Sequence, residues 1–255
     1  MQKFVAISAM VAAMIASLAA ASAAEIKVLS GGAFRQVLLA IIPDFEKATG
    51  HKVTMENDTV GALTQRIEGG EGFDIAVLTP AAIDSLAGKG QIAAGSRTNL
   101  ARVGIGVVVK GGAPRPDIGT VEAFKNALLA AKSVAYIDPQ AGGSSGIYVA
   151  GLFVKLGIAD QMKPKAALIH GGAVAEYVAK GVAEIGIHQI SEILPVKGVT
   201  LVGSLPKEIQ NYTTYAAGLG AKAKAADAAK ALIKSLSDAK AAEVVKAKGM
   251  EPAGS

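Results

Sequence analysis

The chain contains no cysteine and no tryptophan. Without cysteine, it can form no disulfide bridge, no cysteine–zinc site and no thiol nucleophile. Aromatic residues make up only 4% of the sequence, which leaves few side chains on which nucleic-acid bases stack. The 26 basic residues barely outnumber the 21 acidic ones and are scattered along the chain. We therefore expect no nucleic-acid partner and a fold that depends on its hydrophobic core.

One long apolar run stands at the N-terminus, and no later run of about 20 apolar residues follows it. Lys3 precedes the alanine-rich segment 4–21, and Ala21-Ser22-Ala23 matches the small-residue rule for signal-peptidase cleavage. A membrane anchor is the alternative interpretation, which the cleavage site disfavours. We expect residues 1–23 to be a cleaved signal peptide and the mature protein to reside in the periplasm.

Short apolar runs alternate with segments of helical apolar spacing nearly throughout the rest of the chain. The expected strands are 26–29, 52–55, 75–78, 103–110, 134–137, 166–169, 185–188 and 200–202. The expected helices are 34–49, 62–69, 80–89, 120–130, 147–156, 174–180 and a helix pair within 221–248. This alternation is typical of an α/β fold with mostly parallel sheets flanked by helices.

Two extended segments are candidates for a hinge. Residues 103–110 form an unusually long apolar run, and residues 212–218 form a second one. Two such segments can cross between two lobes, with a ligand site in the cleft between them. On this interpretation, lobe one comprises residues 25–104 plus 216–255, and lobe two comprises residues 105–215.

The most informative segment is the Gly/Ser-rich turn within 138–148, between an expected strand and an expected helix. Free N–H groups and the positive end of the dipole at a helix start form a natural anion site. Ser144 and Ser145 add hydroxyl donors, and a similar junction, Ser30-Gly31-Gly32-Ala33, follows the first strand. Such turns also serve as simple tight connections. Two junctions facing one cleft favour a binding site for a small anion.

Several segments share their order and spacing with a known family. They are residues 45–53, 61–67, 73–77, 138–148 and 155–157. In them the chain resembles the periplasmic molybdate-binding proteins of ABC importers. The resemblance implies the two-lobed type II periplasmic binding protein fold, a monomer, and an inner-membrane ABC permease as partner.

The resemblance also implies a set of contacts to the bound anion. The first family serine corresponds to Ala33, which has no hydroxyl, and the second corresponds to Thr59. Two backbone N–H contacts correspond to Ser145 and Val174, and the family's tyrosine corresponds to Gln189. The expected ligand-binding residues are Ser30, Gly32, Ala33, Thr59, Ser144, Ser145, Val174, His188 and Gln189.

Two of the family's three side-chain hydroxyl donors are thus missing. Each donor lost from a buried anion costs about 1.5–3 kcal/mol, so the sequence favours an anion other than molybdate, such as a carboxylate. Arg35 is a candidate bidentate partner for a carboxylate, or else an exposed helix residue. The main interpretation is a solute-binding protein of an ABC importer that captures a small anion.

An enzyme is the alternative. Aconitate isomerase, an exported enzyme that shifts a double bond in a small tricarboxylate by proton transfer, looks similar to this molybdate-binding family, and the loss of the oxyanion donors suits such an enzyme. Its candidate catalytic residues here are His188 and Arg35. His188 is a possible ligand donor, a possible general acid or base, or a plain strand-end residue. The three histidines share no short metal-ligand spacing, so we expect no metal, and no motif indicates a cofactor.

Overall fold

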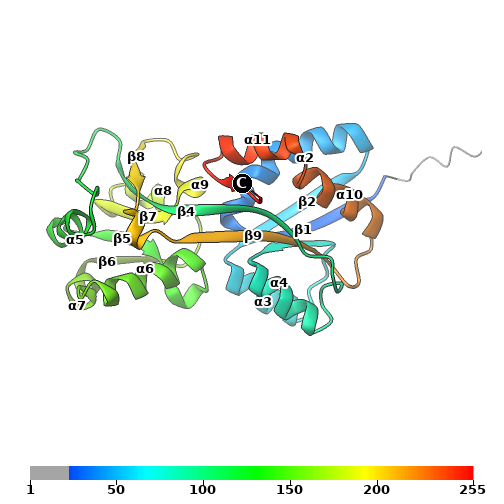
Figure 1. The fold of residues 1–255 in the computed structure, drawn as a ribbon, viewed down its shortest axis with the longest axis horizontal. Helices are drawn as coiled ribbons and strands as arrows, with labels where there is room; N and C mark the ends of the chain where they lie inside the picture. Colours follow the sequence, from blue (N-terminus) through cyan, green and yellow to red (C-terminus); the bar gives the residue numbers. More distant parts are fainter. Residues whose placement is uncertain (1–22, 255) are drawn as a thin grey trace, which may run out of the picture.

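The computed structural model describes residues 23–254 (Figure 1). The expected signal peptide lies outside these residues except for Ala23. The strands are β1 (Glu25–Gly31), β2 (Lys52–Asp58), β3 (Ile75–Leu78), β4 (Thr98–Lys110), β5 (Val134–Ile137), β6 (Ala166–Ile169), β7 (Ile185–Gln189), β8 (Val199–Ser204), β9 (Tyr212–Leu219) and β10 (Glu251–Pro252). Within this part of the chain, no helix has the length and hydropathy needed to cross a membrane.

Helices connect most of these strands. They are α2 (Arg35–Thr49), α3 (Val60–Glu68), α4 (Pro80–Gly88), α5 (Val121–Ala130), α6 (Ser144–Lys155), α7 (Ala159–Met162), α8 (Val174–Ala179), α9 (Ile190–Ile193), α10 (Ala226–Leu236) and α11 (Ala239–Ala247). A short 3-10 turn, Gly32–Phe34, leads into α2. The expected elements are all present in type and order, while α7, α9 and β10 were not expected; the α/β class is confirmed.

The strands form one mixed sheet in the order β2-β1-β3-β9-β4-β7-β5-β6, with β8 and β10 also paired to β4. Parallel pairs occur at the two ends, where β1 pairs with β2 and β3, and β5 pairs with β6 and β7. The middle is antiparallel because β4 and β9 run between the ends in opposite directions. The expectation of mostly parallel sheets is therefore corrected to a mixed sheet.

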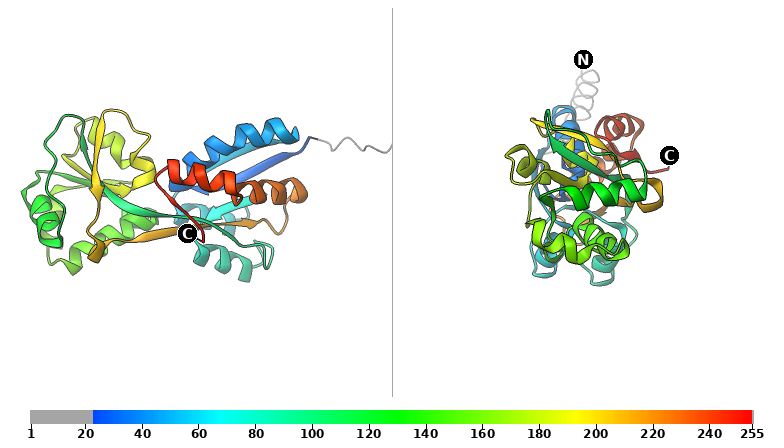
Figure 2. Two further views of the ribbon diagram at one scale, coloured as in Figure 1. Left: turned by 45° about the horizontal axis from the view of Figure 1, so that its top comes forward. Right: turned by 90° about the vertical axis from the view of Figure 1, so that its left-hand side faces the viewer.

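Each end of the sheet has its own core. Phe34 and Leu232 belong to a buried cluster at the β1 end, whereas Phe124 and Phe153 belong to one at the β5 end. Figures 1 and 2 show helices grouped at the two ends of a long molecule, with β4 and β9 between them. The lobe boundaries and the hinge stay predictions, because a continuous sheet joins the two ends.

The first turn of α6 is shaped by glycine. A Cβ on Gly146 would lie 2.2 Å from the Ile137 carbonyl oxygen, so only glycine permits this close approach of helix and strand. Gly142 has a φ of +72°, a backbone conformation that favours glycine. As a result α6 begins at Ser144 rather than at the expected Ile147. Ser144 and Ser145 are therefore the first residues of the helix and not part of a loop.

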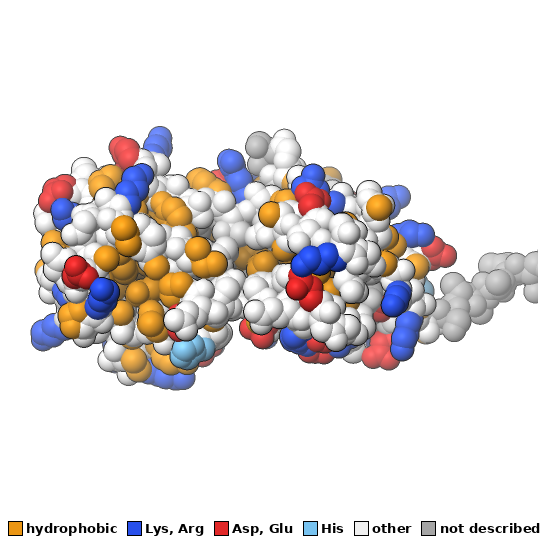
Figure 3. All heavy atoms as spheres, turned by 90° about the horizontal axis from the view of Figure 1, so that it is seen from below, with side chains coloured by type: hydrophobic (Ala, Val, Ile, Leu, Met, Phe, Trp, Pro, Cys, Tyr) orange, Lys and Arg blue, Asp and Glu red, His pale blue; other side chains and the backbone are white. Residues whose placement is uncertain are grey.

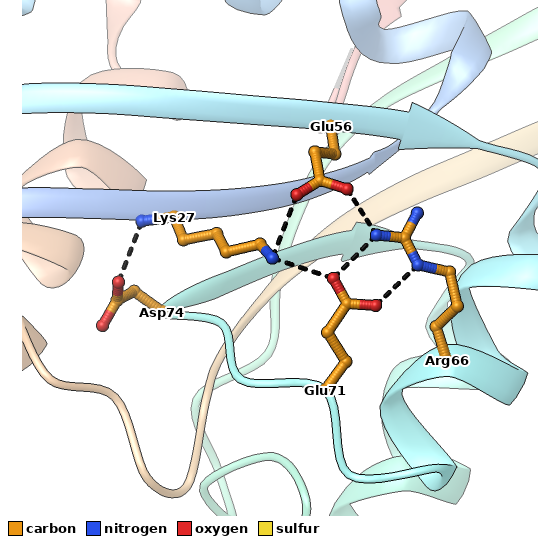
Figure 4. A network of polar contacts seen from close by, with 5 residues as sticks. All are labelled: Lys27, Glu56, Arg66, Glu71 and Asp74. Carbon is orange, nitrogen blue, oxygen red and sulfur yellow. Dashed lines mark hydrogen bonds and ion pairs between the residues drawn. The ribbon is translucent and has the colours of Figure 1, made fainter.

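An ion network ties α3 to the β1 end of the sheet (Figure 4). Lys27 Nζ lies 2.8 Å from Glu71 Oε1 and 3.0 Å from Glu56 Oε1, and Arg66 Nε lies 2.6 Å from Glu71 Oε2. Hydrogen bonds from Arg66 and then Lys27 lower the pKa of Glu71 to about 2. Glu56 is thus engaged in holding β2, α3 and β1 together, away from the ligand site.

Hydrophobic side chains gather on the surface at the β5 end (Figure 3). Ile147 and Val154 of α6 and Leu168 of β6 are exposed there. At the other end, charged side chains of both signs are more evident in the same view. None of these three apolar residues lines the cavity described below.

Candidate functional site

A small cavity of about 100 Å³ lies between the two ends of the sheet, near the middle of the molecule. Its walls come from seven places: the turn after β1, the β2–α3 junction, the end of β5, the start of α6, the loop between β6 and α8, the β7–α9 junction and β9. The lining residues are Gly32, Asn57, Asp58, Thr59, Val60, Ile137, Gly143, Ser144, Ser145, Gly171, Gly172, His188, Gln189, Glu192 and Tyr215. No lysine or arginine of the described chain belongs to this lining.

The N-terminus of α6 forms one wall of the cavity. Its N-cap is Gly143, and no side chain caps it. The first intrahelical bond runs from Ile147 N–H to the Gly143 carbonyl, over 3.1 Å, so the N–H groups of the preceding residues have no partner within the helix. Ser145 is buried, with 3% of its surface exposed. Unpaired N–H groups, a hydroxyl and the helix dipole together suit one negative oxygen group.

A chain of polar side chains supports this wall. Gln189 Nε2 donates to Ser144 Oγ over 3.2 Å, and Thr213 Oγ1 lies 3.2 Å from the same oxygen. Tyr215 OH donates to Gln189 Oε1 over 3.1 Å. Burial is the main reason that the Tyr215 pKa is raised, so its hydroxyl keeps the proton. A tyrosine hydroxyl thus reaches the cavity from β9, although the sequence comparison found none at position 189.

His188 and Glu192 form a second polar wall. His188 Nε2 lies 3.3 Å from Glu192 Oε2, and the two side chains are 2% and 17% exposed. Burial lowers the pKa of His188 to about 3 and raises the pKa of Glu192 to about 8. Because burial is the leading cause for both, the neutral forms are favoured over an ion pair near pH 7. Nδ1 of His188 is buried and has no hydrogen-bond partner among the described residues.

Glu192 also lies against the first glycine junction. A Cβ on Gly32 would meet Glu192 Oε1 at 2.6 Å, so the absence of a side chain at position 32 makes room for the carboxyl group. Our sequence reasoning missed Glu192 and the cavity role of Tyr215. The sequence held no pattern that pointed to Glu192, because His188 lies in β7 and Glu192 in α9, so the two residues do not share a helical turn.

Three expected ligand-binding residues do not line the cavity. Ser30 is buried and its hydroxyl donates to the Gly31 carbonyl over 3.1 Å. Ala33 is buried, and its carbonyl accepts from Ser191 Oγ over 2.9 Å. Val174 is packed into a hydrophobic cluster with no exposed surface. Gly32, Thr59, Ser144, Ser145, His188 and Gln189 do line it.

Thr59 lies where the start of α3 meets the turn before α6. Its Oγ1 accepts from Ala62 N–H over 3.1 Å as the N-cap of α3 and also donates to the Ala141 carbonyl. Next to it, Gly61 N–H donates to the Gly142 carbonyl over 3.1 Å. The α3 start and the turn before α6 therefore touch directly at the edge of the cavity.

Arg35 lies in a wider opening of about 660 Å³ outside the inner cavity. This opening is also lined by Lys197 and Glu176. Gly32, Asn57, Gly172 and Glu192 line both spaces, so the two are adjoining. Arg35, which the sequence suggested as a binding residue, therefore lies at the mouth of the cavity and not inside it.

A helix N-terminus, an amide and hydroxyls around a small cavity in an α/β fold define a protein that binds small anionic solutes. The chain belongs to the family of bacterial extracellular solute-binding proteins, which it matches over residues 26–251. This membership, with the relatives below, confirms the resemblance drawn from the sequence.

The chain is 34% identical to aconitate isomerase from a Pseudomonas species over 253 residues, 97% of this chain and 95% of that protein. It is 31% identical to molybdate-binding protein ModA from Azotobacter vinelandii over 249 residues, 90% of this chain and 91% of that protein. A solved structure of the Azotobacter vinelandii periplasmic molybdate-binding protein superimposes with a TM-score of 0.76 at 19% identity, covering 88% of this chain and 98% of that one.

Proposed function

We propose that the protein is an isomerase that moves a double bond in a small carboxylic acid by proton transfer, in the manner of an aconitate isomerase. The observation that carries this proposal is the contact of the buried His188 with the half-buried Glu192 in the wall of the cavity. Near pH 7 the protonated carboxyl group of Glu192 can donate a hydrogen bond to an anion, and its ionised form is a base at the cavity, which a proton transfer requires. The likeness to aconitate isomerase supports the same function.

One substrate carboxylate binds at the start of α6. The N–H groups of Ser144 and Ser145 and the Ser145 hydroxyl supply donors there. When the carbon next to the carboxylate loses a proton, negative charge spreads into its oxygens. Fixed donors aimed at those oxygens stabilise the transition state more than the ground state.

Glu192 carries the proton. Its raised pKa makes its carboxylate a stronger base than an ordinary glutamate. The carboxylate takes a proton from the carbon between a carboxylate and the double bond, and the C–H electron pair becomes the new double bond. The old double bond opens at its far carbon, which takes the proton back from Glu192. Nothing is oxidised or reduced, and the enzyme returns to its starting state.

His188 is a positioning residue in this scheme. With a lowered pKa it stays neutral, and its Nε2 holds Glu192 Oε2 at 3.3 Å. A neutral imidazole holds the carboxyl group in place through this contact without adding a charge to the wall of the cavity.

The test is an absorbance assay with cis- and trans-aconitate on the purified protein and its Glu192→Gln variant. We expect the wild type to interconvert the two isomers, and the variant to lose about 10²–10⁴-fold in rate. Glu208→Gln, which changes an exposed carboxylate outside the cavity, is the matched control and should retain activity. No conversion by the wild type, or full activity in the Glu192 variant, would refute the proposal.

A second candidate is a periplasmic solute-binding protein that delivers its anion to an inner-membrane ABC permease. The contact of Gly61 with Gly142 favours it, because such a contact suits two lobes that close over a ligand by bending at β4 and β9. In this case the chain acts as a monomer, with lobes 25–104 plus 216–255 and 105–215. Calorimetry that gives tight binding of a small anion, without any turnover of aconitate, would select this function.

A further inference from the structure

We infer that the opening outside the cavity is a second carboxylate subsite, in which Arg35 and Lys197 select substrates that carry two or more carboxylates. This inference rests on the proposed function, since it names the substrate class of the same site. It concerns binding, however, and is testable with a ligand that cannot isomerise.

The first support is the position of Glu192 between two spaces. Its side chain lines both the inner cavity and the wider opening. A carbon within reach of Glu192 therefore has the start of α6 on one side and the opening on the other. A molecule with carboxylates on both sides of its reacting carbon fits this arrangement, with one carboxylate in each space.

The second support is the distribution of positive charge. No lysine or arginine of the described chain lines the inner cavity, so its N–H groups and hydroxyls suit a single carboxylate. Arg35, the first residue of α2, and Lys197, in the loop before β8, line the opening. Both are exposed, and neither takes part in an ion pair with another described residue.

The opposing charges of the opening are those of Glu176 and Glu192. Glu192 is mostly protonated near pH 7, because burial raises its pKa to about 8. Glu176 is exposed at the start of α8 and offsets part of the positive charge. Arg35 and Lys197 are still the lysine and arginine side chains that line the opening, while the inner cavity has none in its lining.

The two cations differ in what they offer. The planar guanidinium of Arg35 can grip a carboxylate with two parallel hydrogen bonds, whereas the ammonium of Lys197 acts as a point charge. We therefore expect Arg35 to set the orientation of the outer carboxylate and Lys197 to add a salt-dependent attraction.

The experiment measures the binding of propane-1,2,3-tricarboxylate, which has no double bond to move, and of butyrate. Calorimetry gives the first dissociation constant and an NMR titration gives the second, weaker one. Arg35→Gln and Lys197→Gln should each weaken tricarboxylate binding about five- to tenfold, and butyrate binding less than twofold. Arg115→Gln and Lys207→Gln, exposed cations elsewhere, are the controls and should change neither constant.

Equal effects on the two ligands, no effect of Arg35→Gln and Lys197→Gln, or no binding of the tricarboxylate would overturn the inference. These outcomes are distinct from a failure of the proposed function. If the protein binds the tricarboxylate through Arg35 and Lys197 but never isomerises aconitate, the subsite is supported and the proposed enzymatic function is refuted. If the protein isomerises aconitate equally well after both cations have been replaced, the enzymatic function is supported and the subsite is refuted.

Discussion

His188 Nε2 and Glu192 Oε2 lie 3.3 Å apart in the wall of a cavity whose opposite side is the start of a helix. Strand β7 ends just after His188, and α9 begins at the next residue but one, so strand and helix together set this distance. Burial favours the neutral form of each side chain. Near pH 7 the pair is therefore a neutral histidine beside a mostly protonated carboxyl group rather than an ion pair.

The stability of the protein should fall as the pH rises from about 4.5 to 8 because of Glu192. Its pKa is raised to about 8 from the ordinary 4.5, so its contribution is fully present below pH 4.5 and is lost as the pH rises through 8. The wild type should lose up to about 1.4 kcal/mol per pH unit relative to Glu192→Gln.

The window from pH 6.5 to 8 isolates this effect. The His188 pKa is lowered to about 3 from 6.5, so its contribution is lost only as the pH falls from 6.5 toward 3. Urea unfolding of wild type and variant at pH 6.5 and 8 measures the difference. A gap between the two proteins that is the same at both pH values would show that Glu192 ionises as an ordinary glutamate.

The rate should rise with pH up to about 8. Glu192 acts as a base only after it loses its proton, so kcat/KM of the free enzyme follows its ionisation. We expect about a tenfold gain per pH unit below 8 and a plateau above. A pH–rate profile with trans-aconitate tests this. A rate that is constant from pH 6 to 8 would exclude Glu192 as the base.

Thr59→Val should destabilise the protein even without a ligand. The Thr59 hydroxyl caps α3 and donates to the Ala141 carbonyl, so its loss removes a cap and leaves that carbonyl unpaired. We expect a cost of about 0.5–2 kcal/mol in the free energy of unfolding. Thr59→Ser keeps the hydroxyl and is the control. If the valine and serine variants unfold at the same denaturant concentration, the Thr59 hydroxyl does not contribute to the stability of the fold.

Gly61→Ala should weaken ligand binding because the added methyl group would keep the start of α3 away from the turn before α6. A Cβ at this position would lie 2.8 Å from Gly142 Cα, closer than real Cβ contacts. Gly72→Ala, where a Cβ would meet no atom within 4 Å, is the control. We expect about a tenfold rise in the dissociation constant of propane-1,2,3-tricarboxylate for the first variant only. Unchanged binding would mean that this contact is not needed for the ligand-bound state.

Much of the fold was predictable because apolar spacing is a local property. The ranges of β3 and β5 equal the expected strands 75–78 and 134–137. Strand pairing is not local, however. Nothing in the sequence of β9 indicates that it pairs antiparallel with both β3 and β4, and so the mixed middle of the sheet was missed.

The site was predictable in part for the same reason. Glycine and serine in a strand–helix turn revealed the start of α6, and the end of an apolar strand revealed His188 and Gln189. Tyr215 was missed because it reaches the cavity from a strand far away in sequence. Ala33 and Val174 were expected from family positions, but local packing buries both of them.

The most direct test of the account is proton NMR of trans-aconitate in D₂O with the purified protein. Removal of a proton from one carbon and its return to another should convert trans- to cis-aconitate, and exchange of the Glu192 proton with the solvent between these two steps should place deuterium at the methylene carbon. Glu192→Gln should abolish both changes. Binding of aconitate with neither isomerisation nor exchange would contradict the account and leave the protein a carrier of its anion.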